Sequence, residues 1–416
     1  MIENLIEIGR VPVPPWGETR HFLIVGKPGT GKTTLLNQVI ENIRARGEKA
    51  IIHDFKGDYV STFYDPETDF LFNPIDERSI NWCLFSEIEM QPDIDSIATS
   101  MIPESTRDDK FWIDAARDVF SSILYYLKAT GQESNQAIWE HVTKTEQEML
   151  ELMQTAVAQG LEQCKKALGY LQGFEKGSKV ASDVLSTMRQ YTNCFQYMTH
   201  LQKDFSIKKW LESDKGGFIF ITNYANLRDT LKPALSLFID TALKHLLSLP
   251  DDLNRRVFFI LDEFASLQRL TTIIRTLEQG RSKGASVWIA TQDTSQLQKL
   301  YGKETASTIA NTTNTIISFA LNDPDSCEFL SRVFGEREVL ETDETVSMGP
   351  SDFKDGLSIV RKRKTERLIL PSEFTTLRDL ECFLKLLSYD ITKTKIPLKT
   401  FEKKNKPFVL NAKFKF

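Results

Sequence analysis

The sequence is poor in the residues that build metal centres and disulfide frameworks. Its five cysteines and five histidines are spread along 416 residues, and no two cysteines have the close spacing of a zinc site or a redox pair. A zinc enzyme and a secreted, disulfide-bonded protein are therefore disfavoured, and a reducing cytosol is expected. The sequence also has no signal peptide and no apolar run long enough to cross a bilayer. The protein is thus either soluble or anchored by a segment outside this sequence.

An excess of positive charge is missing as well. The formal net charge is −5, with 26% charged and 41% hydrophobic residues, which is the composition of an ordinary soluble globular protein. A protein that coats polyanions over its whole surface would be basic, so any contact with nucleic acid must be local. The length predicts two or three domains and a large buried core.

What the sequence does contain is a glycine-rich loop between an apolar run, His21–Val25, and a helical pattern that begins at Leu35. Its spacing, Gly-x-x-x-x-Gly-Lys-Thr, is that of a P-loop, whose glycines let backbone N–H groups point at phosphates beside the positive end of the next helix. We therefore predict ATP binding, with Lys32 on the β- and γ-phosphates and Thr33 on Mg²⁺. The alternative is a glycine-rich turn that binds nothing. The predicted nucleotide-binding residues are Gly26, Lys27, Pro28, Gly29, Thr30, Gly31, Lys32, Thr33 and Thr34.

An apolar run followed by two acids is the second decisive motif. Asp262 and Glu263 directly follow Val257–Leu261, which is the pattern of a Walker B strand. Ligands bind at the carboxyl ends of strands in open α/β sheets, so Asp262 is placed to position Mg²⁺ and Glu263 to act as general base for the attacking water. A core strand that ends in an exposed acidic turn is the alternative, and the accompanying P-loop disfavours it.

Two more strands end in polar residues at the same edge. Gln292 follows the strand Ser286–Ala290, where an amide can contact the γ-phosphate or the water and act as a sensor of hydrolysis; a simple polar cap of the strand is the alternative. Asp54 ends the strand that begins at Ala50 and opens a turn through Asp58. It could contact the metal shell or position the P-loop, and a plain turn remains open beside these roles.

Two arginines, Arg20 and Arg281, lie just before strands and not after them. In a parallel sheet these positions are at the edge opposite the phosphates, and a five-residue strand spans roughly 16 Å. Neither side chain can then reach the nucleotide of its own subunit. If they are catalytic, they act on a neighbouring subunit as arginine fingers; a surface salt bridge is the alternative for each.

Apolar strands alternate with helices in the first and last parts of the chain, which predicts an α/β fold with a parallel sheet covered on both faces. A helix to about Arg281 is expected after the acidic pair. Between about Cys83 and Gln202 apolar residues recur at helical spacing and no strand is expected. We therefore predict a nucleotide-binding domain made of residues 1–82 and 203–416, and an inserted all-α domain at 83–202. The expected strands are His21–Val25, Ala50–Asp54, Gly217–Ile221, Val257–Leu261, Ser286–Ala290 and Thr315–Phe319.

Two stretches are locally basic. Residues 343–367 are polar and then basic, with the run Arg361–Lys364, and predict a flexible loop or hairpin; the tail beyond Lys393 is rich in lysine. Each is interpreted as a solvated surface, with nucleic-acid contact as the sharper alternative.

Several longer runs accompany these motifs, and together they resemble the coupling proteins of conjugative type IV secretion systems. This is the TraG/TraD-like family, in the FtsK–HerA class of DNA-pumping ATPases, and the resemblance covers nearly the whole chain. The Asp-Glu-Phe-Ala-Ser-Leu run at 262–267 and the Gln-Asp-Thr-Ser-Gln-Leu run at 292–297 are more specific than the P-loop. The runs are Val11–Pro14, Arg20–Gly26, Asp54–Asp58, Asp204–Leu211, Leu261–Leu267, Gly280–Gly284 and Thr291–Leu297.

The resemblance implies a RecA-like P-loop NTPase with an inserted all-α domain, assembled as a homohexamer around a channel at the cytoplasmic face of the bacterial inner membrane. It implies recruitment of DNA, single- or double-stranded, bound to a relaxase, and its ATP-driven delivery to the type IV secretion channel. Arg20 and Arg281 match the positions of the family's proposed arginine fingers. Family members usually carry an N-terminal transmembrane segment, which this sequence does not contain.

Two functions from different classes remain open. One is a hexameric, DNA-stimulated ATPase that moves a nucleoprotein, and the other is an ATP-switched module that recruits secretion substrates through the helical domain without moving DNA. They differ in whether DNA or a protein partner stimulates hydrolysis. An unrelated P-loop enzyme such as a kinase is disfavoured, because the interfacial arginines suit a ring and no motif for an acceptor substrate is present.

Overall fold

A nine-stranded sheet in the order β13-β12-β9-β3-β8-β7-β4-β6-β5 forms the centre of the computed structural model, which describes residues 4–104, 109–172, 179–347 and 356–415. The strands from β5 to β9 run parallel, as the alternation of strands and helices predicted, and β12 and β13 continue the sheet antiparallel. The strands are β3 (Phe22–Val25), β4 (Lys49–Asp54), β5 (Phe70–Phe72), β6 (Gly217–Thr222), β7 (Val257–Leu261), β8 (Ala285–Thr291), β9 (Thr315–Ser318), β12 (Glu381–Leu386) and β13 (Thr392–Lys395).

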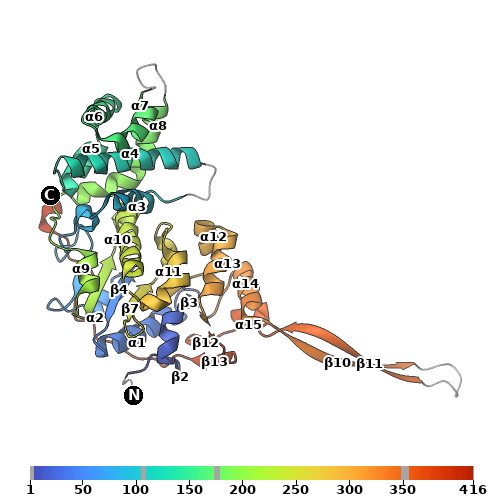
Figure 1. Cartoon of the computed structure of the whole chain (residues 1–416). Coiled ribbons are helices and arrows are strands. Elements are labelled where there is room, and N and C mark those ends of the chain that lie inside the picture. Colours follow the sequence, from blue (N-terminus) through green and yellow to red (C-terminus); the bar gives the residue numbers. More distant parts are fainter. Residues whose placement is uncertain (1–3, 105–108, 173–178, 348–355, 416) are drawn as a thin grey trace.

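Each central strand is apolar throughout because the sheet is covered on both faces. Successive side chains of a strand point to opposite faces, so Phe22 and Ile24 belong to one buried core and Leu23 and Val25 to the other. The first core lies under α1 (Lys32–Ala45) and α2 (Asp58–Phe63), and the second under the helices that follow β6 (Figure 1). Those helices are α10 (Arg228–Ser248), α11 (Ile273–Gln279), α12 (Thr294–Tyr301), α13 (Lys303–Thr312) and α14 (Pro324–Phe334).

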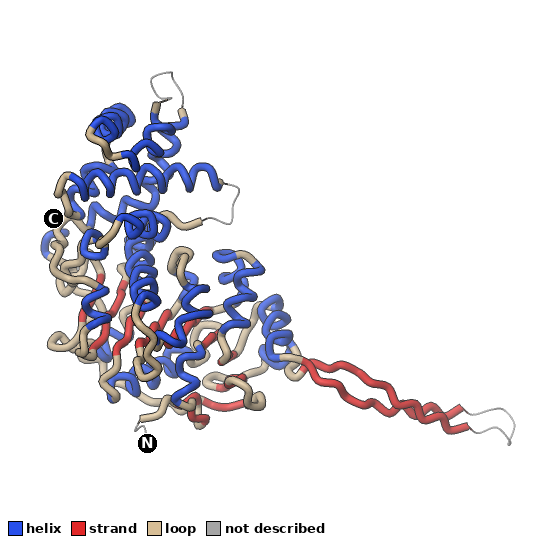
Figure 2. Tube along the Cα trace, in the orientation of Figure 1, coloured by secondary structure: helices blue, strands red, loops and turns tan. Residues whose placement is uncertain are grey.

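The segment between β5 and β6 is helical, and no strand occurs in the described part of residues 83–202, as predicted. We call α3 to α8 the helical region; it gathers at one end of the molecule beyond α10 (Figures 1 and 2). An isolated bridge joins Trp82 to Phe205, so the chain leaves and re-enters the sheet at neighbouring points. The exact boundaries of the inserted domain stay a prediction, because one apolar core runs through both parts. The helices are α3 (Gln91–Met101), α4 (Lys110–Ala129), α5 (Asn135–Val142), α6 (Glu146–Ala158), α7 (Lys165–Leu171) and α8 (Val180–Thr192), with α9 (Ile207–Glu212) before β6.

Two long appendages complete the chain. The predicted hairpin is present and longer than expected: β10 (Glu336–Ser347) pairs with β11 (Gly356–Arg367), and the arm projects far from the body (Figures 1 and 2). Residues 348–355, inside the predicted range, lie outside the described residues. The lysine-rich tail packs back on the body, where Lys399 and Lys403 form ion pairs with α1 and α2. Smaller elements are β1 (Glu7–Ile8), β2 (Val11–Pro12) and α15 (Pro371–Thr375).

The prediction that a helix begins directly after the acidic pair is wrong. α11 begins only at Ile273, and a short 3₁₀ turn, Phe264–Ser266, and irregular chain precede it. Glu263 has a φ of +50°, which a continuing helix could not contain. Among the described helices, none is both long and apolar enough to span a bilayer.

Candidate functional site

The predicted site residues converge at the carboxyl edge of the sheet, by which we mean the edge where the parallel strands end. Strand order places β8 between the P-loop strand β3 and the acidic strand β7, so the residue after β8 lies between the two motifs. A pocket of about 360 Å³ opens there. It is lined by Pro28, Gly29, Gly31, Lys32, Thr33, Thr34, Phe55, Lys56, Asp262, Glu263, Gln292, Asp379, Leu380 and Leu398.

The P-loop depends on glycine at its tightest point. Gly31 has a φ of +118°, which side-chain-bearing residues rarely adopt, and a Cβ there would lie 2.9 Å from the end of the Leu380 side chain, which would have to shift. Gly26, Lys27 and Thr30 shape the loop from behind and do not line the pocket. The Thr30 hydroxyl donates to the Lys27 carbonyl at 2.7 Å, and the Gly26 N–H donates to the carbonyl of Thr291 in β8.

Lys32 lies folded over its own loop. Its ammonium donates to the carbonyl oxygens of Gly26 and Lys27, the second at 3.3 Å. Burial lowers the pKa of Lys32, and the nearby carboxylates of Glu263 and Asp262 oppose that shift. An ammonium held by two carbonyls at a phosphate-binding loop can exchange these neutral acceptors for charged phosphate oxygens.

Asp262 accepts hydrogen bonds at both its side chain and its backbone carbonyl. Its Oδ2 accepts a hydrogen bond from the Tyr59 hydroxyl at 3.1 Å, and that hydroxyl also lies beside Thr33. Its backbone carbonyl accepts from Nδ1 of the buried His53 at 2.7 Å. Since a carbonyl only accepts, Nδ1 carries the proton, and burial lowers the pKa of His53 to about 4 and keeps the ring neutral. Burial also raises the pKa of Asp262.

The predicted base and sensor contact each other. Gln292 Nε2 donates to Glu263 Oε2 at 2.8 Å. Glu263 occupies the left-handed region without being glycine, a conformation that costs roughly 1–3 kcal/mol and that surrounding structure must enforce. These two residues were predicted separately from the ends of two strands, and the structure joins their side chains in the pocket.

Asp54 performs the role of a turn residue. Its carboxylate accepts the N–H groups of Gly57 and Val60, both at 2.8 Å, and does not line the pocket. Burial raises the pKa of Asp54 to about 7. The turn that it stabilises begins α2 and thereby places Tyr59 against Asp262.

Arg20 and Arg281 lie at the amino edge of the sheet, where the strands begin. The Arg20 guanidinium lies 4.9 Å from the centre of the Trp16 ring. Arg281 is exposed, and within the described residues its guanidinium has no hydrogen bond or ion pair. The seven residues of β8 span roughly 20 Å, so neither arginine reaches the pocket of its own chain, as the sequence predicted.

Sequence reasoning missed one wall of the pocket. Asp379, Leu380 and Leu398 come from the end of the chain, some 350 residues after the P-loop, and belong to no motif. Leu380 has a φ of +69° and donates its N–H to the carbonyl of Thr30 at 2.9 Å. A non-glycine residue strained against the P-loop marks this segment as part of the site.

The donor set suits Mg²⁺ bound together with a nucleotide. Within the described ranges, no group of three or more His, Cys, Asp or Glu side chains is placed to hold a metal ion. Mg²⁺ does not need one, because it usually keeps several waters and uses one or two protein oxygens plus phosphates. Thr33 and Asp262 provide such oxygens on either side of Tyr59.

Three comparisons place this chain among known proteins. A family model described as the type IV secretion-system coupling protein DNA-binding domain matches residues 5–399. The coupling protein TraD of Escherichia coli K12 is 28% identical over 389 residues, which are 92% of this chain and 53% of TraD; the chain thus spans about half the length of that relative. The unbound structure of the bacterial conjugative coupling protein TrwBΔN70 superposes with a TM-score of 0.83 at 28% identity, over 98% of this chain and 92% of that one.

Other structures of TrwB hold nucleotides. TrwB in complex with ADP and Mg²⁺ has a TM-score of 0.83 at 27% identity, with 98% of this chain and 92% of that chain covered. TrwB was also solved with the non-hydrolysable analogues ADPNP and GDPNP.

Proposed function

This chain belongs to the family of type IV secretion-system coupling proteins, and from that premise we propose that it is a Mg²⁺-dependent ATPase that recruits DNA bound to a relaxase and drives it into the secretion channel during conjugation. One observation carries the proposal: the Gln292–Glu263 hydrogen bond lies in the same pocket as Lys32 and Asp262. The nucleotides held by TrwB support ATP as the ligand.

Several residues of the pocket have separate roles in the proposed reaction. Lys32 exchanges its loop carbonyls for the β- and γ-phosphate oxygens, while Thr33 and Asp262 would hold Mg²⁺, which would neutralise developing charge. Glu263 accepts the proton of the attacking water, and Gln292 leaves Glu263 to orient that water. Because the pKa of His53 is lowered, its ring stays neutral, and its Nδ1–H donates to the backbone carbonyl of Asp262 and holds that backbone in place.

The ring is the second part of the proposal. Arg281, and Arg20 beside it, project from the amino edge of one subunit toward the pocket of the next in a homohexamer at the cytoplasmic face of the inner membrane. Each pocket then contains a base from one chain and an arginine from its neighbour, so that hydrolysis requires assembly. DNA in the central channel promotes that assembly through a few Lys and Arg contacts.

The test is ATP turnover against protein concentration, with and without single- and double-stranded DNA, at two salt concentrations. We expect turnover per subunit to rise with concentration and with DNA, and the DNA effect to fall at high salt. A measurable rate that is flat and indifferent to DNA would reject the DNA motor. Stimulation of that rate by a relaxase without DNA would instead support an ATP-switched recruitment module.

A further inference from the structure

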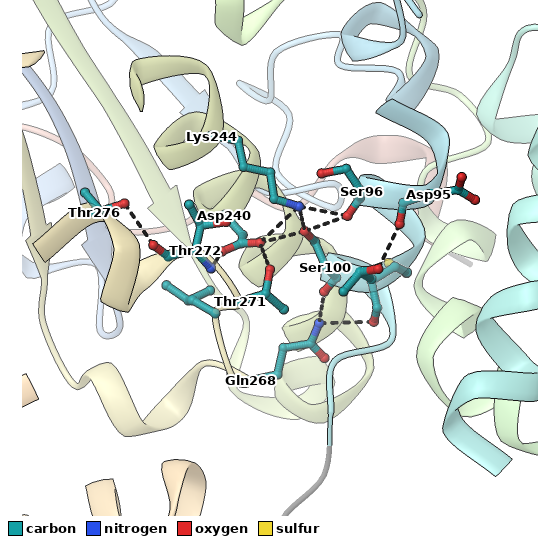
Figure 3. A network of polar contacts seen from close by, with 12 residues as sticks. Asp95, Ser96, Ser100, Asp240, Lys244, Gln268, Thr271, Thr272 and Thr276 are labelled. Atoms are coloured by element: carbon teal, nitrogen blue, oxygen red, sulfur yellow. Dashed lines mark hydrogen bonds and ion pairs between the residues drawn. The ribbon is translucent and has the colours of Figure 1, made fainter. Parts of the chain in front are cut away.

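A buried polar network lies where the chain following Glu263 meets the helical region (Figure 3). At its centre is Asp240 of α10, whose side chain is 1% exposed. Its Oδ2 accepts hydrogen bonds from the hydroxyls of Ser100 and Thr271, both at 2.6 Å, and its Oδ1 accepts the N–H of Thr272 at 2.8 Å. A buried carboxylate requires such donors, so this contact fixes three segments to one another.

Lys244, one helical turn after Asp240, adds the positive charge. Its ammonium lies 3.6 Å from Asp240 Oδ2 and donates to the Ser96 carbonyl at 2.8 Å and to the Ser100 hydroxyl. Lys244 also lines a cavity of about 470 Å³ between α3, α9 and α10. The network therefore extends from a surface cavity to the segment that follows the acidic pair.

Gln268 is the link between that segment and α3. Its Nε2 donates to the carbonyl oxygens of Ser100 at 3.0 Å and Met101 at 3.2 Å, which are among the last carbonyls of α3 and have no partner within the helix. Its own backbone N–H donates to the Ser236 hydroxyl of α10 at 2.9 Å. Gln268 thus caps one helix while its backbone is fixed to another.

The six residues from Glu263 to Gln268 and the chain just after them are held by contacts with neighbouring elements. Phe264 stacks on Tyr301 of α12, with ring centres 5.6 Å apart and planes 7° from parallel. The Tyr301 hydroxyl accepts the N–H of Leu270 at 3.0 Å. The chain from Glu263, which is in the left-handed region, to Gln268 is therefore held at Phe264 and at Gln268 itself.

We propose that Gln268 is a positioning residue that couples Glu263 to α3 of the helical region, with Asp240 as the fixed point of the coupling. When Glu263 releases Gln292 to take up the attacking water, Gln268 changes its hold on the end of α3. Coupling free energies are reciprocal, so a partner that moves α3 also changes the binding of nucleotide. This proposal rests on the function proposed above, because it requires that Glu263 responds to ATP.

Hydrogen–deuterium exchange of the full chain, with and without a non-hydrolysable ATP analogue, tests it. We expect the analogue to slow exchange at residues 26–34 and to change exchange at residues 91–101. In Gln268→Met, which keeps the volume but loses the donor, the response at 26–34 remains and the response at 91–101 is lost. Turnover falls by roughly 10- to 100-fold with KM unchanged, since Glu263 is misplaced while nucleotide contacts remain.

His245→Leu is the matched control, because it removes a 2.9 Å contact between α10 and Glu87 without touching the segment 263–272. It should retain both exchange responses. Gln268→Glu, whose carboxylate cannot donate to carbonyls, should repeat the loss if Gln268→Met fails to fold. An unchanged response at 91–101 in a folded Gln268 variant overturns the coupling alone. No response at 26–34 in the wild type overturns the proposed function and the coupling with it.

Discussion

The two edges of the central sheet differ in whether their functional side chains already have partners. At the carboxyl edge, Lys32, Glu263 and Gln292 line one pocket, and each already has a hydrogen-bond partner. At the amino edge, Arg281 is exposed and, in the part of the chain described, unpaired, while Arg20 rests on Trp16. One edge carries the pocket, which no arginine of the described residues lines, and the other carries these two arginines but no nucleotide-binding motif. In the proposed ring, these two edges would supply the two halves of each interfacial site.

The largest effect is expected at the carboxyl edge. Lys32→Ala should abolish ATP turnover and leave the fold intact, because the ammonium binds only carbonyls of its own loop. Turnover and thermal unfolding measured together would show this, and Lys165→Ala is the control, since that lysine forms an exposed ion pair with Glu162 in the helical region and does not line the pocket. Normal turnover in Lys32→Ala would contradict the P-loop assignment.

The next effect tests whether the amino edge acts on a neighbour. Arg281→Ala should lower turnover by about 10³-fold, the lower range for an arginine finger. Mixing it with Glu263→Gln should partly restore turnover, because the two defects then fall on different interfaces. Arg275→Ala, an exposed arginine on α11, is the control.

Absence of rescue at every mixing ratio, with assembly confirmed by sedimentation, would contradict action between subunits. Arg20→Ala tests the other arginine at the same edge. Its guanidinium already rests on Trp16, so a smaller loss than for Arg281→Ala is expected.

Each edge of the sheet also contains a buried histidine, His21 at the amino edge and His53 at the carboxyl edge. Burial lowers the pKa of His21, at the amino edge, to about 4, as it does for His53 at the other edge. Below about pH 6.5 each of these histidines is protonated in the unfolded chain but stays neutral in the folded chain. The free energy of unfolding is therefore highest above that pH and decreases as the pH drops toward 4. His21→Gln should reduce this loss by on the order of 1–3 kcal/mol. Thermal unfolding at pH 7 and pH 5 would measure it, and equal acid sensitivity in both proteins would refute it.

The smallest effect is expected at the wall from the end of the chain. Leu398 is 76% exposed and lines the nucleotide pocket. Leu398→Ala should raise KM for ATP a few-fold with kcat unchanged, because only ground-state contact is lost. Leu253→Ala has the same chemistry at 74% exposure outside the pocket and should change neither constant. A fall in kcat for Leu398→Ala would assign this wall a role in the chemical step.

The sequence was sufficient where a motif lies within a few residues of a strand end. Lys32, Asp262 and Gln292 could be placed in one pocket because parallel strands bring their carboxyl ends to one edge. The same reasoning put the two arginines at the other edge. Continuous apolar runs identified the long parallel strands but not β5, which has only three residues.

What could not be predicted depends on contacts between distant segments. Nothing in the local pattern distinguishes Leu380 or Leu398 from other leucines near the end of the chain. The sequence around Tyr59 indicates no more than an aromatic residue in a short helix, and only the structure shows that its hydroxyl donates to Asp262. Gln268 reads as a loop residue, because its partners are backbone carbonyls of α3, which carry no sequence signal.

The position of β3 in the sheet has a consequence for synthesis on the ribosome. Among the described residues, the P-loop strand pairs with β8 and β9 alone, whose first residues, Ala285 and Thr315, follow Val25 by about 260 and 290 positions. At translation rates of about 5–20 residues per second, the nascent P-loop waits for tens of seconds without a strand partner. During that time its apolar residues, Phe22 to Val25, lack the neighbouring strands with which they pair in the folded protein. A nascent chain stalled before Ala285 should therefore fail to bind nucleotide, however well the helical region has already folded.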